Sequence, residues 1–176
     1  MIAASSMPIG TYANSSKIPH NAPWCEACDI PCRLTTGKEI YPYRADLAKK
    51  HVWICDGCKA RVGCHPRGSN PMGTPANGHL RRARQLLHER MIDPIWKTAP
   101  DHCPNEANGT RPKNKEIFKG ARSQTYRFLA AKMGLDGEDC HTGMFTLEQC
   151  RAAWRALDGV TYPEIQEWAK IQDGRA

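Results

Sequence analysis

The chain has 176 residues, 24% of them charged, and a formal net charge of +7. This length allows one modest domain, or a metal-stabilised module with a helical extension, and it excludes a large catalytic core. No apolar run approaches the roughly 20 residues that cross a bilayer, and residues 1–16 lack the regions of a secretory signal, so we expect a cytoplasmic protein without a membrane partner.

The positive charge is concentrated in the first three quarters of the chain. Residues 1–135 carry 21 Lys and Arg against 10 Asp and Glu, whereas residues 136–176 carry 4 against 8. A basic body of this kind attracts polyanions, nucleic acid first among them. A solvated basic surface without a partner is the alternative interpretation, because charge alone identifies no ligand.

The N-terminal part predicts a flexible tail followed by short strands. Residues 1–22 are rich in Ser, Ala, Asn and Pro and have no periodicity. Residues 38–43 and 51–55 have the β-branched and aromatic content of strands and predict a hairpin, to which residues 59–64 can add a third strand. The Gly- and Pro-containing residues 66–75 then predict a loop.

Helices are predicted in most of the remaining chain. Residues 77–91 predict a helix with one apolar face, which we expect to dock on the strands. This face consists of Leu80, Ala83, Leu87 and Met91. Residues 98–120 are polar and predict a linker. Further helices are expected to begin at Ser123, Thr146 and Thr161, the first two ending at Gly134 and Gly159.

Two Cys-x-x-Cys pairs predict a metal site. Cys25 and Cys28 form one pair and Cys55 and Cys58 the other, with 26 residues between the pairs. Two residues between thiolates let both sulfurs reach one ion, and four sulfurs suit tetrahedral Zn²⁺. We therefore predict one structural zinc ion. A redox dithiol or buried cysteines without metal are the alternatives.

The remaining cysteines leave further options open. Cys32 and Cys64 lie near the two pairs but are themselves unpaired, and they are interpreted as small buried thiols. A second metal site would need soft ligands that lie around the linker and the third helix. These residues are His102, Cys103, Cys140, His141 and Cys150. Their spacing is poor, and Cys150 is equally explained by the apolar face of its helix.

A set of basic residues could contact phosphates. Arg81, Arg84 and His88 lie along one flank of the helix at 77–91, beside the loop that carries His65 and Arg67. The residues expected to bind nucleic acid are Arg67, Arg81, Arg84, Lys119 and Arg122. A solvated helix face is the alternative.

His65 and His88 also permit an enzyme interpretation. They could act as a general acid and base pair in a nuclease, with Asp93 as a further group. No catalytic motif supports this interpretation. Isolated histidines are more often hydrogen-bonded structural groups.

Several longer motifs occur together in this chain. They are YPYRADL at 41–47, VWICDGCKARVGCHP at 52–66, PMGTPANGHLRRARQLLHERMIDPIW at 71–96, RSQTYRFLAAKMG at 122–134 and HTGMFTLEQC at 141–150. With the first cysteine pair, this combination resembles a zinc-finger-containing domain of uncharacterised bacteriophage and prophage proteins. The resemblance implies zinc binding by the four paired cysteines and a phage-like origin, and it implies no activity.

These observations together predict an α+β fold. A zinc ribbon of short antiparallel β-hairpins carries a docked helix and is followed by a small C-terminal helical unit. The predicted parts are a flexible tail (1–22), the ribbon with its basic helix (23–97), a polar linker (98–120) and the helical unit (121–176).

The expected function is that of a zinc-binding, phage-type accessory protein in the cytoplasm of a bacterial host. It would bind DNA or RNA through its basic surface without catalysis. The first alternative is a protein-interaction module that targets a host factor through the ribbon or the acidic tail. The second is a nuclease that uses His65 and His88.

Overall fold

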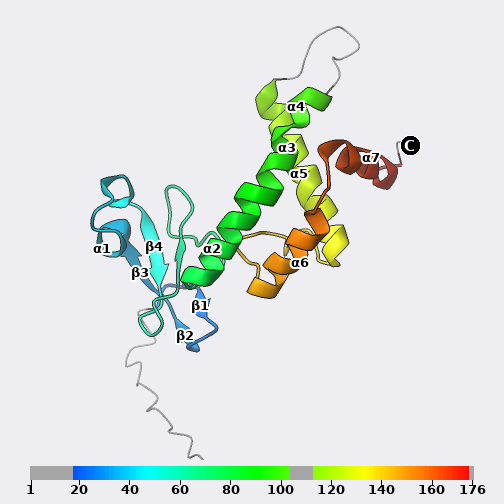
Figure 1. Cartoon of the computed structure of the whole chain (residues 1–176). Coiled ribbons are helices and arrows are strands. Elements are labelled where there is room, and N and C mark those ends of the chain that lie inside the picture. Colours follow the sequence, from blue (N-terminus) through cyan, green and yellow to red (C-terminus); the bar gives the residue numbers. More distant parts are fainter. Residues whose placement is uncertain (1–17, 104–112, 175–176) are drawn as a thin grey trace, which may run out of the picture.

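A strand-rich ribbon and a group of helices make up the structure. This computed structural model describes residues 18–103 and 113–174. The strands lie in the N-terminal part and the longer helices follow from residue 78 (Figure 1). The predicted α+β fold class is therefore confirmed. Within the two described ranges, no helix combines the length and the apolar character needed to cross a membrane.

The ribbon consists of two small antiparallel sheets. The first pairs β1 (Trp24–Cys25) with β2 (Ile30–Pro31), and the second has the order β3 (Arg33–Thr36), β4 (His51–Ile54) and β5 (Arg61–Gly63). The register places Trp53 between Leu34 and Val62. The Trp53 side chain is fully buried, mostly among cysteines and small apolar residues. So small a core needs a further source of stability, such as a metal.

The first predicted strand is in the wrong place. Residues 38–43 do not form a strand; the chain turns at Gly37 into the short helix α1 (Gly37–Ile40). The partner of β4 is the preceding segment β3. A Cβ atom at Gly37 would overlap the Leu47 carbonyl group, so this close tertiary contact fixes the turn. The predicted strands at 51–55 and 59–64 are confirmed by β4 and β5.

Most of the predicted N-terminal tail lies outside the described residues, which begin at 18. The described end of this segment contacts the ribbon. The Asn21 amide donates hydrogen bonds of 3.0 Å to Ser69 Oγ and to Asn70 Oδ1. Residues 18–22 are thus held against the loop after β5.

One continuous helical rod follows the ribbon. It consists of α2 (Gly78–Leu87), η3 (His88–Ile92) and α3 (Asp93–Lys97), and α4 (Ala99–His102) follows. Asn77 caps the rod, because its Oδ1 accepts the Leu80 N–H at 2.9 Å. The predicted helix at 77–91 is confirmed, and the rod extends beyond it.

The segment η3 is a π turn, in which the Asp93 N–H bonds to the His88 carbonyl five residues earlier. Pro94 follows directly and has no N–H to donate. A proline ring inside an α-helix also collides with the carbonyl four residues before it. The wider π turn accommodates Pro94 without breaking the rod.

Three helices complete the fold: α5 (Asn114–Met133), α6 (Leu147–Leu157) and α7 (Tyr162–Gln172). The predicted caps are confirmed, since Gly134 is left-handed after α5 and capping boxes begin α6 and α7. The helix predicted from Ser123 begins earlier, at Asn114. Together with α4, this makes both ends of the predicted linker at 98–120 helical, while residues 104–112 lie outside the described residues.

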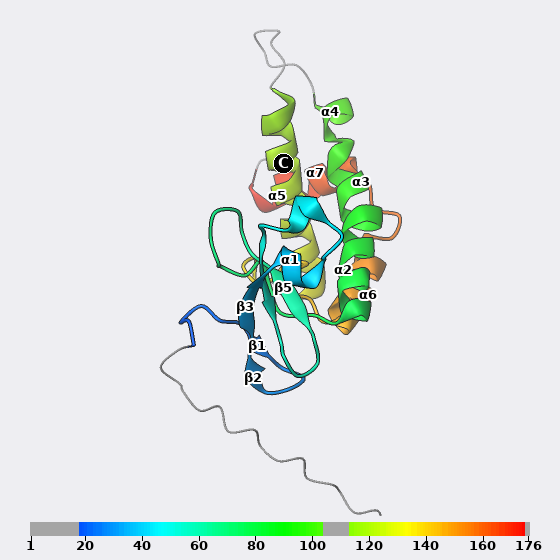
Figure 2. The ribbon, with the colours of Figure 1, turned by 90° about the vertical axis from the view of Figure 1, so that its left-hand side faces the viewer.

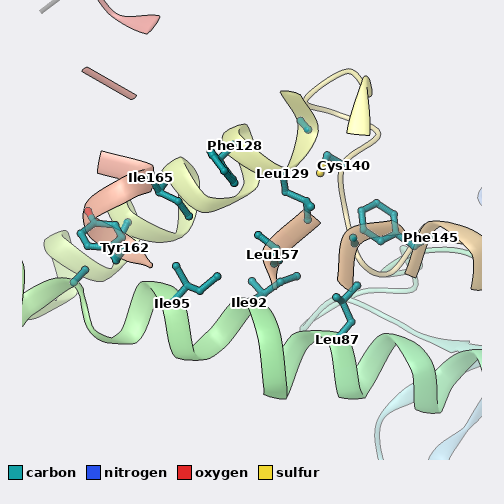
Figure 3. Close-up of a cluster of buried hydrophobic side chains, with 14 of the residues drawn as sticks. Leu87, Ile92, Ile95, Phe128, Leu129, Cys140, Phe145, Leu157, Tyr162 and Ile165 are labelled. Atoms are coloured by element: carbon teal, nitrogen blue, oxygen red, sulfur yellow. The ribbon is translucent and has the colours of Figure 1, made fainter. Parts of the chain in front are cut away.

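The main core lies between the rod and the C-terminal helices. In Figure 3, Leu87 and Ile92 of the rod point toward Leu129 of α5 and Leu157 of α6, and all four are buried in one cluster. The apolar face of α2 was expected to dock on the strands. It packs instead into this helical core, because periodicity identifies an apolar face but not its partner.

The opposite flank of α2 lies beside the ribbon. In the view of Figure 2, the ribbon faces the reader with α2 next to β5. Arg61 of β5 forms an isolated bridge with Ala76 just before α2, and the Arg81 side chain donates to the Ala76 carbonyl at 2.9 Å. The ribbon therefore contacts α2 mainly through polar groups.

Candidate metal centre and adjoining basic cleft

The four paired cysteines converge at one end of the ribbon. The ligand atoms of Cys25, Cys28, Cys55 and Cys58 all lie within 4.8 Å of one another. Among the described residues, this is the only such group of three or more histidine, cysteine or acidic side chains. Four sulfurs at this spacing fit one tetrahedral, structural zinc ion, as the sequence predicted.

Each cysteine pair lies in a tight turn with the same backbone pattern. The Asp29 N–H bonds to the Cys25 carbonyl at 2.8 Å, and the Lys59 N–H bonds to the Cys55 carbonyl at 2.9 Å. Asp29 and Lys59 both have a positive φ, of 53° and 62°. These left-handed residues bend the chain back so that both sulfurs of a pair face the same point.

The protonation of the thiols favours a divalent cation at this point. The pKa of Cys28 is raised to about 12, first by its hydrogen bond with Cys58 and then by burial. The pKa of Cys58 is lowered to about 7, mainly by the Ala60 N–H. Without metal, the cluster therefore keeps protons that a zinc ion would displace.

The other candidate ligands do not join a metal group. Cys32 is 3% exposed and packs in the ribbon core beside the four ligands. Cys140 and Cys150 are buried in the helical core, and His102 lies beside the ring of Tyr162. This distribution explains these cysteines as packing groups, and the described residues hold no second ligand cluster.

Arg84 connects two loops that are distant in sequence. Its Nε donates to the Phe145 carbonyl at 2.8 Å, Nη1 to the Thr74 carbonyl at 2.9 Å and Nη2 to Thr74 Oγ1 at 2.7 Å. Burial lowers the pKa of Arg84. Its hydrogen-bonding capacity is largely used inside the protein. Arg81 is similarly half-buried and donates to the Ala76 carbonyl.

The same two loops cross where two glycines meet. A Cβ atom at Gly73 would overlap the Gly143 carbonyl group, and Gly73 has a φ of 153°. The Thr74 N–H donates to the Gly143 carbonyl at 3.0 Å. Only residues without a side chain permit this approach. The contact joins the loop after β5 to the loop between α5 and α6.

A cleft of about 650 Å³ opens beside this crossing. Its basic lining comes from four separate segments: His65, Arg84, His88, Arg122 and His141. Glu89 and Asp93 are its acidic residues. Burial and the positive charge of Arg122, in that order, lower the pKa of His141, with smaller effects from the other basic groups of the cleft. The basic groups therefore act on one another across the cleft.

His88 forms an ion-pair contact with Asp93 inside the cleft. The His88 Nδ1 lies 2.8 Å from Asp93 Oδ1. The same carboxylate accepts the Trp96 Nε1–H at 3.1 Å and the Lys97 ammonium at 2.8 Å. In an α-helix, residues five apart point about 140° away from each other. The π turn removes this separation and brings Asp93 beside His88.

A second, more apolar depression adjoins the cleft. Trp96, Phe118 and Tyr126 line it together with Lys119, and Arg122 is shared with the cleft. Arg122 lies over the Tyr126 ring at 5.9 Å. Among described residues, neither Lys119 nor Arg122 has a hydrogen bond or ion pair. These two cations are free to meet an anion.

Arg67 lies elsewhere among the predicted phosphate contacts. It is exposed in the loop after β5 with a positive φ of 66° and does not line the cleft. The structure thus brings together His65, His88 and Arg122, and it leaves Arg67 and Arg81 apart from them. The sequence analysis overlooked the aromatic depression and the role of the π turn. Pro94 within a helical pattern was the available signal.

Comparison with known proteins gives one match. Residues 21–108 match the model of a family described as a zinc-finger-containing domain. This range includes all four predicted zinc ligands and the whole rod through α4. No curated protein and no solved structure matches the chain.

Proposed function

Because this chain belongs to the family of the zinc-finger-containing domain, we propose that it is a zinc-stabilised protein that binds nucleic acid through the cleft and the neighbouring aromatic depression. The observation that supports this proposal is the pair of free cations, Lys119 and Arg122, beside three aromatic rings. Cations contact phosphates, and aromatic rings stack on bases of a single strand. The surface therefore suits single-stranded nucleic acid.

The structure changes which arginines should be tested. Arg81 and Arg84 donate to backbone carbonyls, and removing them would disturb the fold as well as any binding. Lys119 and Arg122 are exposed, so their charges can be removed without loss of internal contacts. Arg67 remains a peripheral phosphate contact within the proposal.

The test is a fluorescence titration of the zinc-loaded chain with labelled single- and double-stranded RNA and DNA at several salt concentrations. We expect salt-sensitive binding, and Lys119→Gln with Arg122→Gln should reduce the salt slope by about 2. Lys132→Gln is the matched control, because Lys132 lies on the same helix but outside both depressions. Absence of binding to every form at low salt would refute the proposal.

A second candidate function is docking of a host protein. Leu147 and Trp154 are 39% and 40% exposed on α6 and line an apolar groove against α2. Exposed apolar grooves of this kind bind protein partners. A bacterial extract passed over the immobilised chain, compared with Trp154→Ala, tests this alternative. A captured protein that depends on Trp154 would favour it.

The setting of the protein is also proposed. The motifs given above resemble those of phage and prophage proteins, which places the proposed function in the cytoplasm of an infected bacterium. Expression from an induced prophage, followed by mass spectrometry of the host cell fractions, would test both points.

A further inference from the structure

We propose that the cleft is an RNA-cleaving site in which His88 is the general base and His65 the general acid. This inference rests on the proposed nucleic-acid binding and adds a reaction to it. The described residues supply every protein group that the reaction needs, and RNA supplies its own nucleophile, the ribose 2′-hydroxyl.

The environment of His88 prepares one of its nitrogens. Asp93 accepts the Nδ1–H of neutral His88 at 2.8 Å, so the lone pair is on Nε2. Among described residues, Nε2 has no hydrogen-bond partner. Trp96 and Lys97 hold the Asp93 carboxylate from its other sides. A carboxylate held in this way fixes the tautomer and the ring orientation, so Asp93 is a positioning residue.

The other groups of the cleft have complementary properties. His65 is exposed on the loop after β5 and no described residue bonds to its ring, so it can carry a proton to the cleft. His141 accepts the Gly143 N–H on Nδ1 at 3.1 Å, which leaves its Nε2–H as a neutral donor. Arg122 adds a free guanidinium. These donors suit the non-bridging oxygens of a phosphodiester.

The reaction is an internal transfer at phosphorus. His88 Nε2 takes the proton of the 2′-hydroxyl, and the 2′-oxygen forms a bond to phosphorus. The bond from phosphorus to the 5′-oxygen breaks, and protonated His65 gives its proton to that leaving oxygen. The products are a 2′,3′-cyclic phosphate and a 5′-hydroxyl end. Solvent then restores the proton of each histidine, and no other reactant is consumed.

The groups that face His88 determine the pH dependence. They are Asp93 and Glu89 on its own rod, Arg84 one turn earlier, His65 from the ribbon loop, Arg122 from α5 and His141 from the next loop. A base and an acid that must be in opposite protonation states give a bell-shaped rate profile. Asp93→Asn should shift the acid limb of this profile, which a merely structural role would not do.

The test uses the zinc-loaded full chain, without other added metal, and a labelled single-stranded RNA. The same sequence with 2′-O-methyl groups serves as the uncleavable partner. We expect cleavage of RNA to cyclic-phosphate ends, with binding but no cleavage of the 2′-O-methyl strand. His88→Gln and His65→Gln should each reduce the cleavage rate by about 100-fold or more while RNA affinity stays unchanged. His79→Gln, at an exposed position outside the cleft, should have no effect.

The outcomes separate the two proposals. Failure of the chain to bind any RNA refutes the proposed function and this inference together. Binding without cleavage refutes the inference alone. Cleavage that persists in both His88→Gln and His65→Gln, or that also cuts the 2′-O-methyl strand, likewise refutes it. His65 is exposed, so its variant stays informative even if the His88 variant fails to fold.

Discussion

At the scale of single residues, the zinc ligands combine unequal environments in one site. Cys25 and Cys55 are buried, Cys28 is half-buried and Cys58 is exposed. Zinc binding by such a site contributes roughly 10 to 16 kcal/mol in small zinc peptides. The ribbon core contains one large side chain, Trp53, so metal binding is the main stabilising contribution in this part of the chain.

We expect Cys28→Ser to lose the zinc ion and unfold the ribbon, since a hydroxyl does not replace a thiolate. Zinc content by mass spectrometry should fall from one ion per chain to near zero. The helical signal should persist, because the helical core contains no ribbon residue. Cys64→Ser is the control and should keep one ion. A zinc-replete Cys28→Ser protein would contradict the assignment.

His141 provides a prediction about pH. Burial and the charge of Arg122 lower its pKa in the folded state, so the unfolded chain binds more protons near the ordinary imidazole pKa of about 6.5. Stability must therefore rise with pH through this window and fall as the solution becomes more acidic. The melting temperature between pH 5 and 7.5 should show this slope, and His141→Gln should flatten it. An unchanged slope in the variant would exclude His141 as the cause.

At the scale of elements, the crossing of two loops holds the cleft in shape. The loop after β5 and the loop before α6 approach each other at Gly73 and Gly143, and Arg84 bonds to both loops. Their separation in sequence means that neither loop alone determines the geometry. The crossing therefore couples the ribbon to the helical core.

We expect Gly73→Ala to separate these loops and to lower the free energy of unfolding by about 1–3 kcal/mol, from overlap and backbone strain. Gly78→Ala is the matched control. Its Cβ would meet no atom within 4 Å at the start of α2, so it should be neutral or stabilise by up to about 1 kcal/mol. Urea denaturation of both variants measures the difference. Equal stabilities would show that the crossing is not required.

The elements also show what sequence can predict. Capping at Thr146 and Thr161 depends on residues three positions apart, and both predictions are confirmed. The zinc ligands follow from equally local spacing. The strand at 38–43 was wrong, since the contact of Gly37 with Leu47 is tertiary and overrides strand propensity.

The cleft could not be predicted for a related reason. It combines residues from the ribbon loop, the rod, α5 and the loop before α6, and their alignment depends on packing. The pairing of His88 with Asp93 also violates the 3.6-residue periodicity on which helix patterns depend. Sequence analysis named His65, His88 and Asp93 but had no means of placing them in one site.

At the scale of the whole molecule, the family match and the core have different boundaries. The match ends at residue 108, yet Leu87, Ile92 and Ile95 within it pack on α5, α6 and α7. The C-terminal helices therefore complete a core that begins inside the matched region.

We expect a fragment ending at residue 108 to bind zinc but to associate through its exposed apolar rod. Size-exclusion chromatography with light scattering should show oligomers or aggregates, whereas the rod of the full chain is covered. Adding Leu87→Lys and Ile92→Lys to the fragment should reduce the association, because both side chains belong to the uncovered stripe. A monomeric, cooperatively unfolding fragment would contradict this expectation.

The order in which the chain is synthesised gives the shared core a further consequence. All four zinc ligands leave the ribosome once residue 58 has emerged, so the ribbon can bind metal early. The rod follows, but its partners on α7 extend to Ala169. At about 5–20 residues per second, the rod stays uncovered for several seconds on each nascent chain. During that interval its apolar stripe is a binding site for chaperones, while the ribbon behind it is already folded.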